Sequence, residues 1–104
     1  MTEFAEHVAE LIASIPKGYV ASYGLIAILA GRPRGARLVG FMMHSLKADL
    51  PFHRVVFQDG SICQGDPFGH PDVQRGMLID EGVCFLVDGR VDMTKSAWDG
   101  NILL

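Results

Sequence analysis

The strongest constraint on the fold is a break, Gly31-Arg32-Pro33-Arg34-Gly35, between two short segments with helical patterning, residues 22–30 and 36–46. Glycine and proline both interrupt a helix, so the two segments form separate helices. Ser22 is a good N-cap for the first. The apolar side chains expected to point inward are Leu25, Ile26 and Leu29, then Leu38, Val39, Met42 and Leu46. Two short helices joined by a glycine-containing turn outline a helix-turn-helix.

Further helices are expected at both ends of this unit. Apolar residues fall on one stripe over residues 3–15, with Thr2 as a possible cap. A last helix is expected from Asp72 through Glu81, ended by Gly82. Its inward side chains would be Val73, Met77 and Leu78.

Short β-segments complete the prediction. Asp59-Gly60 lies between two segments of β-forming residues, 55–57 and 62–63, and indicates a hairpin. Asp88-Gly89 lies between residues 83–87 and 90–93 and indicates a second hairpin. Trp98 is expected to pack back on the core. The predicted fold class is mostly α with small β-hairpins, a winged-helix-like helix-turn-helix domain.

Composition limits the remaining choices. The chain has 104 residues, of which 49% are hydrophobic and 20% charged, which fits a single domain over 1–104. No apolar run reaches the roughly 20 residues that span a bilayer, so we expect a cytoplasmic protein. Two cysteines, Cys63 and Cys84, are too few for a disulfide scaffold and match no zinc spacing. Because the histidines are also scattered, we expect neither metal nor cofactor.

The charge is unevenly distributed. A net charge of −3 argues against general affinity for nucleic acid. However, no acidic residue lies between Glu10 and Asp49, whereas five basic ones do: Lys17, Arg32, Arg34, Arg37 and Lys47. One face can therefore be basic, and the small residues Ala36 and Gly40 would let the helix backbone approach a groove closely. A merely solvated basic loop remains an alternative.

Several motifs occur in a recognisable order: Ser22-Tyr23-Gly24, Gly31-Arg32-Pro33, Ala36-Arg37-Leu38-Val39-Gly40, Pro51-Phe52-His53-Arg54 and Glu81-Gly82. Together they resemble the DNA-binding domain of the O6-alkylguanine-DNA alkyltransferase family. In that family the fourth motif reads Pro-Cys-His-Arg, and its cysteine accepts the alkyl group. Phe52 holds the cysteine's position and has no lone pair to displace an alkyl group. The chain thus resembles the alkyltransferase-like proteins, and the resemblance implies that it is not an enzyme.

The resemblance also implies a function and a set of site residues. The partner would be double-stranded DNA containing O6-alkylguanine, whose damaged nucleotide is flipped into a pocket. Arg37 would fill the vacated position, and Tyr23 would lie beside the nucleotide's phosphate. The implied DNA-binding residues are Tyr23, Arg32, Arg34, Ala36, Arg37 and Gly40, and the implied lesion pocket is lined by Tyr23, Phe52, Val55 and Val56. His53 and Glu81 match a proton relay that has no thiol to serve, so we expect them to hold their elements together. Repair through nucleotide excision repair proteins and a monomeric state are further expectations.

Three other hypotheses stay open at this stage. Pro51-Phe52 can simply end a loop and fill the core before a strand begins at Arg54. Cys63 can act as an alternative alkyl acceptor, although it lacks the Pro-x-His-Arg context. The helix-turn-helix can also belong to a transcription regulator that reads the major groove, which would leave Pro51-Phe52-His53-Arg54 unexplained.

Overall fold

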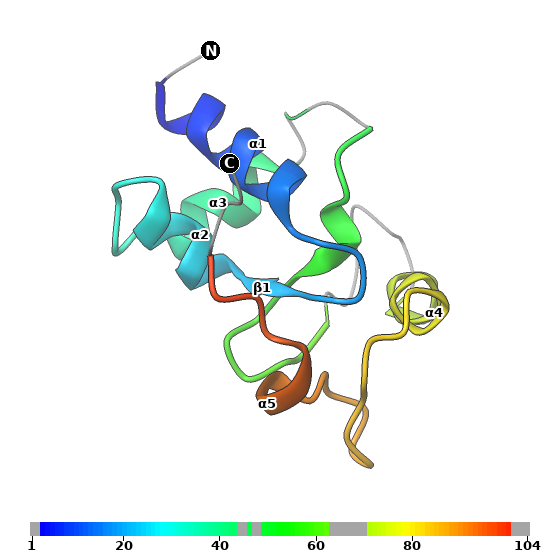
Figure 1. Cartoon of the computed structure of the whole chain (residues 1–104). Helices are drawn as coiled ribbons and strands as arrows, with labels where there is room; N and C mark the ends of the chain where they lie inside the picture. Colours follow the sequence, from blue (N-terminus) through cyan, green and yellow to red (C-terminus); the bar gives the residue numbers. More distant parts are fainter. Residues whose placement is uncertain (1–2, 44–45, 47–48, 63–70, 101–104) are drawn as a thin grey trace.

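The computed structural model describes residues 3–43, 46, 49–62 and 71–100 of the chain. Three helices, α1 (Glu3–Ser14), α2 (Tyr23–Leu29) and α3 (Ala36–Met42), pack together on one side of the molecule (Figure 1). The helix α4 (Pro71–Asp80) lies on the other side, and the two-residue strand β1 (Ala21–Ser22) runs between them (Figure 1). The mostly helical, helix-turn-helix type of fold predicted from the sequence is confirmed.

The first helix forms where its apolar stripe predicts it. Phe4, Val8, Leu11 and Ile12 are buried on one face of α1 and contribute to the larger of two core clusters. The helix ends at Ser14, one residue before the predicted end, and Ile15 is also buried. The proposed cap Thr2 lies outside the described residues.

The turn between α2 and α3 follows from local sequence chemistry. Ser22 caps α2, because its hydroxyl oxygen accepts a hydrogen bond from Leu25 N at 3.0 Å. Gly31 then adopts a positive φ of 96°, which other residues rarely adopt. The predicted helix 36–46 ends earlier, at Met42, and residues 44–45 lie outside the described part.

Two leucines predicted to point inward do not. Leu29 and Leu38 are exposed, whereas Val39 and Met43 are buried against the core. Successive residues on a helix are rotated by about 100°, so a helix whose buried stripe runs through Val39 turns Leu38 away from it. The sequence pattern contained more apolar positions than the short helix α3 can bury.

The predicted hairpin at 55–63 is only partly correct. The chain does reverse there, since Phe57 N donates to Ser61 O at 2.9 Å and Gly60 has a φ of 88°. The strand β2 (Val55–Val56), however, pairs in parallel with β1, in the register Ala21 with Val55 and Ser22 with Val56. Both valine side chains are fully buried. An alternation pattern shows that a strand is buried but cannot show which distant segment pairs with it.

The helix α4 buries only Leu78 of the three side chains predicted to point inward. Val73 and Met77 are exposed, while Gln74 and Leu78, four residues apart, are fully buried. The helix ends at Asp80, one residue before the predicted end, and Gly82 follows it as the terminating residue that was predicted. Gly82 has a φ of 86°, and Val83 N donates to Leu78 O at 3.0 Å.

The last segment returns to the centre of the molecule. The predicted 83–93 hairpin is reduced to a single antiparallel bridge between Phe85 and Val91, and the short helix α5 (Met93–Ser96) follows. Trp98 is buried as predicted, and its backbone N donates to Val20 O at 2.7 Å. This contact attaches the end of the chain to the residue that precedes β1.

Candidate nucleic-acid interface and the adjoining buried network

The segment Pro51-Phe52-His53-Arg54 forms a 3₁₀ turn, η1 (Phe52–Arg54), that leads directly into β2. Phe52 retains 8% of its surface exposed and packs in the same core cluster as Tyr23. The phenyl ring therefore fills the core at this point, as the simpler interpretation of the motif predicted.

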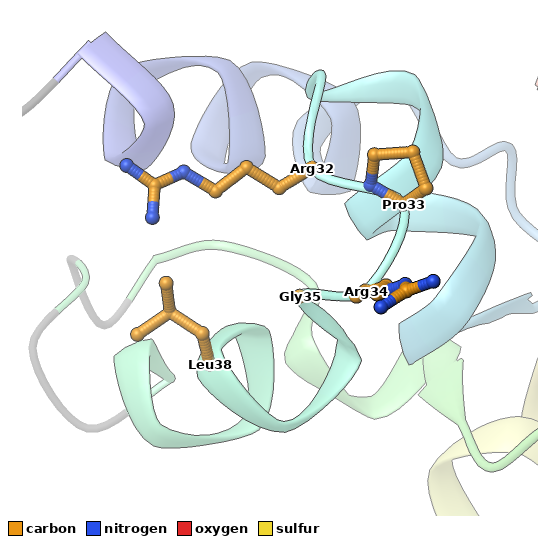
Figure 2. Close-up of a pocket in the computed structure, with 5 residues that line it drawn as sticks. All are labelled: Arg32, Pro33, Arg34, Gly35 and Leu38. Atoms are coloured by element: carbon orange, nitrogen blue, oxygen red, sulfur yellow. The ribbon is translucent and has the colours of Figure 1, made fainter.

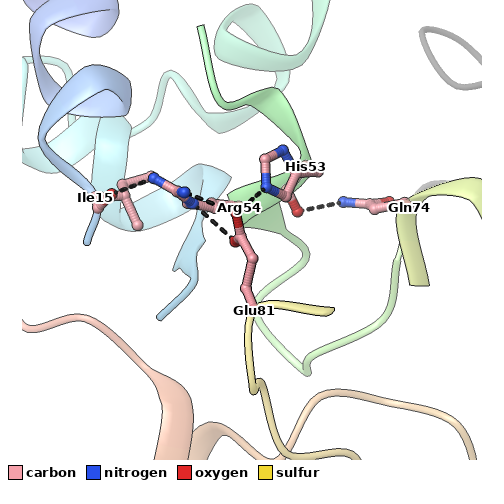
Figure 3. A network of polar contacts seen from close by, with 5 residues as sticks. All are labelled: Ile15, His53, Arg54, Gln74 and Glu81. Carbon is pink, nitrogen blue, oxygen red and sulfur yellow. Dashed lines mark hydrogen bonds and ion pairs between the residues drawn. The ribbon is translucent and has the colours of Figure 1, made fainter. Parts of the chain in front are cut away.

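Arg54 and Glu81 form a nearly buried ion pair with two parallel hydrogen bonds (Figure 3). Arg54 Nε donates to Glu81 Oε1 at 2.9 Å, and Nη2 donates to Oε2 at 2.7 Å. Arg54 Nη1 donates to the backbone oxygen of Ile15 at 2.9 Å. The guanidinium thus joins three regions: the end of α1, the η1 turn and the residue after α4.

His53 and Gln74 extend this network. His53 Nε2 lies 3.0 Å from Glu81 Oε2, at ion-pair distance but without the alignment of a hydrogen bond. The buried side-chain amide of Gln74 donates to the backbone oxygens of His53 and Val55, both at 3.0 Å. Sequence reasoning missed Gln74, because a single glutamine in a helical pattern is normally assigned to the solvent face.

The network fixes the charge of Glu81. Hydrogen bonds from Arg54 lower the pKa of the Glu81 carboxyl to about 2, against the raising effect of burial, and His53 adds a smaller lowering effect. Each carboxylate oxygen accepts one hydrogen bond from Arg54. Glu81 therefore holds η1 against the end of α4 through its two hydrogen bonds from Arg54, and His53 Nε2 lies beside the same carboxylate without a hydrogen bond.

A second group of residues lies where α3 crosses the start of α2. A Cβ atom placed on Gly40 would be 4.0 Å from Cε1 of Tyr23, so the helix α3 passes closely over that ring. The Tyr23 ring in turn packs on Phe57 with centroids 5.1 Å apart and planes tilted by 50°. Phe57 is 47% exposed. Sequence reasoning placed it only in a strand, although an aromatic residue beside a turn was a usable signal.

The three arginines of the turn do not form one cluster. The Arg32 guanidinium lies 4.9 Å from the ring centroid of Phe4, on α1, whereas Arg34 points in the opposite direction (Figure 2). Arg37 is exposed on α3. An open hollow of about 520 Å³ is lined by Arg32, Pro33, Arg34, Gly35 and Leu38. The region is thus basic, with its arginines spread along the turn and the first turn of α3.

The remaining predicted pocket residues are placed as follows. Val55 and Val56 have fully buried side chains, and their backbone is paired with β1, while Val55 O also accepts from Gln74. The structure therefore does not bring these two predicted residues to an exposed pocket wall. Ala36 and Gly40 are half-buried on α3. The alternative acceptor Cys63 lies outside the described residues. Within the described ranges, no group of three metal-ligating side chains exists, and no helix is long and apolar enough to cross a membrane.

Comparison with known proteins identifies the family. Residues 3–83 match the family described as 6-O-methylguanine DNA methyltransferase, DNA binding domain. The DNA base-flipping protein of Escherichia coli is 40% identical over 100 residues, covering 92% of this chain and 74% of that protein. Alkyltransferase-like protein 1 of Schizosaccharomyces pombe is 38% identical over 85 residues, covering 80% and 79%. The chain belongs to the alkyltransferase-like family.

Solved structures agree with this assignment. The alkyltransferase-like chain matches S. pombe Atl1 in complex with damaged DNA containing O6-carboxymethylguanine, with a TM-score of 0.79 and 32% identity. This match covers 95% of this chain and 97% of Atl1. It also matches the Mycobacterium tuberculosis O6-methylguanine methyltransferase, with a TM-score of 0.66 and 32% identity. This match covers 79% of this chain and 50% of the transferase. The match to the transferase thus includes only half of that enzyme.

Proposed function

We propose that this alkyltransferase-like protein recognises O6-alkylguanine in duplex DNA by rotating the damaged nucleotide into a site beside Tyr23 and Phe52, and that it transfers no alkyl group. The observation that carries the proposal is Phe52, which packs in the core between Pro51 and His53. This is the position of the acceptor cysteine in the motif of the transferases. The relatives named as base-flipping and alkyltransferase-like proteins support the same conclusion.

The chemistry at Phe52 is incompatible with alkyl transfer. Displacement of an alkyl group from guanine O6 needs an electron pair on the acceptor, and a phenyl ring supplies none. The neighbouring His53 and Glu81 would generate a thiolate only if a thiol were present, and Glu81 is already held by Arg54 through two hydrogen bonds. A flat apolar ring can instead form one wall of a binding site for a base.

The exposed part of the helix-turn-helix supplies the DNA contacts in this proposal. Arg37 fills the space left by the rotated nucleotide, and Arg34 contacts phosphate. Tyr23 lies under α3 at Gly40, where the rotated nucleotide would pass. Arg32 contributes less than the sequence suggested, because its guanidinium is packed on Phe4.

A paired titration tests the proposal. Matched duplexes with guanine and with O6-methylguanine are titrated with the protein, and the intact mass of the protein is measured after long incubation. We expect tighter binding to the methylated duplex and an unchanged mass. A gain of one methyl group on Cys63 or Cys84 would make the protein a transferase, and equal affinity for both duplexes would remove lesion recognition.

We further propose that the bound protein promotes repair of the lesion through nucleotide excision repair proteins and that it acts as a monomer in the cytoplasm. The reason is chemical: without an acceptor, binding alone leaves the alkyl group on the base, so removal requires another activity. Incision of an O6-methylguanine duplex by purified excision proteins, with and without this chain, tests the coupling. Unchanged incision rates would contradict it.

A further inference from the structure

The solvent-facing side of α3 carries two large apolar side chains. Phe41 is 69% exposed and Leu38 is 39% exposed, whereas Val39 and Met43 on the opposite side are buried. Phe41 and Leu38 are three residues apart and therefore adjacent on the helix surface. An exposed phenylalanine next to a leucine makes no contribution to the core, so the fold itself gives no reason for it.

The charges around this apolar pair favour a polyanion. Arg37 precedes Phe41 by four residues, so the two side chains lie on the same face of α3, one turn apart. Leu38 also borders the hollow that Arg32 and Arg34 line. No acidic residue occurs anywhere between Glu10 and Asp49. A basic apolar face of this kind suits a duplex, whose grooves combine phosphates at the rim with apolar sugar and base surfaces inside.

We propose that Leu38 and Phe41 form an apolar wedge that packs against the DNA nucleotides flanking the flipped one, with Phe41 as its tip. Four residues of helix advance by about 6 Å, less than two base-pair steps of about 3.4 Å each. With Arg37 in the vacated position, Phe41 therefore lies between one and two steps from it, within reach of the flanking nucleotides. This inference rests on the proposed function, because Arg37 sets the position from which the distance is counted.

The wedge has a defined physical effect. An aromatic ring inserted or packed at a base step partly unstacks it, and the contact with bases and sugars repays the cost. The wedge then stabilises the opened duplex whatever the sequence beside the lesion. It releases no counterions, so its contribution to affinity is independent of salt. The unchanged salt dependence therefore distinguishes loss of Phe41 from loss of an arginine that contacts phosphate.

The test compares Phe41→Ala with Val87→Ala, a truncation of a fully exposed apolar residue in the 85–91 turn, away from α3 (Figure 1). Each is titrated against O6-methylguanine and guanine duplexes over a range of salt. A 2-aminopurine placed next to the lesion reports unstacking. We expect Phe41→Ala to weaken binding to the lesion duplex about tenfold and to reduce the 2-aminopurine signal at saturation, with an unchanged salt slope. Val87→Ala should behave as wild type.

The outcomes separate this inference from the proposed function. If wild type shows no preference for the lesion but Phe41→Ala still weakens duplex binding with the same salt slope, the proposed function fails, and Phe41 remains an apolar DNA contact without a flipped nucleotide beside it. If Phe41→Ala binds both duplexes like wild type, the wedge is wrong. It is also wrong if sedimentation shows that Phe41→Ala dissociates a dimer while DNA affinity is unaltered. Thermal unfolding of both variants confirms that each is folded.

Discussion

Arg37 and Arg54 are the same amino acid in two very different regions of the molecule. Arg54 is nearly buried and donates hydrogen bonds to Glu81 and Ile15. Arg37 is exposed on α3, and its guanidinium has no partner within the part of the chain that the structure describes. Side chains whose bonding capacity is used by the fold determine stability. Side chains that the fold leaves unused are available to a ligand.

The largest expected effect lies in the buried region. Arg54→Ala removes three hydrogen bonds and leaves the Glu81 carboxylate almost buried with only His53 beside it. We expect a loss of about 3–5 kcal/mol in the free energy of unfolding, measured by chemical denaturation. The control is Arg75→Ala, which breaks an exposed pair with Asp72 and should cost less than about 1 kcal/mol. Lower lesion affinity at unchanged stability would place Arg54 in the binding region instead.

Phe52→Cys tests whether only the nucleophile is missing. Removing the buried ring should lower the free energy of unfolding by about 2–4 kcal/mol. We expect little or no methyl transfer, because a displacement reaction tolerates little misplacement of its nucleophile and Glu81 is held by Arg54. Phe52→Ala, which removes the ring without adding a thiol, controls for the lost volume. Rapid transfer of radiolabelled methyl to the new thiol would show that the buried network still works as a relay.

Acid should affect the buried region in a defined pH window. The pKa of Glu81 is lowered from 4.5 to about 2 in the folded chain, so the unfolded state takes up the proton first. Stability from this group is complete above pH 4.5 and is lost as the pH falls toward 2. The loss should be smaller than that in Arg54→Ala, because the arginine's bond to Ile15 remains. Glu81→Gln should remove this part of the pH dependence, and an unchanged acid profile in that variant would contradict the assignment.

Substitution of the exposed Arg37 on α3 should change DNA affinity and leave the free energy of unfolding unchanged. Arg37→Ala should weaken binding to an O6-methylguanine duplex by about 1–3 kcal/mol and binding to undamaged DNA by less, because the side chain replaces a nucleotide only in the opened state. Fluorescence anisotropy with both duplexes measures the difference. Equal losses on the two duplexes would assign Arg37 to phosphate contact.

The smallest effect is expected for Arg34→Ala. A phosphate contact carries no base information, so affinity for damaged and undamaged duplexes should fall equally, and the slope of log affinity against log salt should decrease by about 1. Arg32→Ala provides the comparison for Arg34→Ala. Because Arg32 packs on Phe4, its removal should slightly lower stability as well. Opposite results for the two arginines would reverse their assignment.

The sequence predicted the local features of this fold well. The stripe of α1, the Ser22 cap and the glycine end of α4 each depend on residues a few positions apart. The sequence-based predictions were wrong or incomplete where a feature depended on segments that are distant along the chain. The parallel pairing of β2 with β1 and the burial of Gln74 are set by neighbours 19 or more residues away. The motif Pro51-Phe52-His53-Arg54 is continuous in sequence and could be located there. The packing of Phe57 on Tyr23 joins residues far apart in sequence and was visible only in three dimensions.

The contact between Trp98 and Val20 has a practical consequence for kinetics. Trp98 is the chain's single tryptophan, and its backbone bonds the residue just before β1. β1 pairs with β2 only after the intervening chain has closed into a loop. Tyr23 directly follows β1 and Phe52 lies shortly before β2, so loop closure brings both side chains into the same core cluster. Intrinsic emission, which changes as Trp98 becomes buried, therefore offers a label-free signal for following this assembly in a stopped-flow refolding experiment.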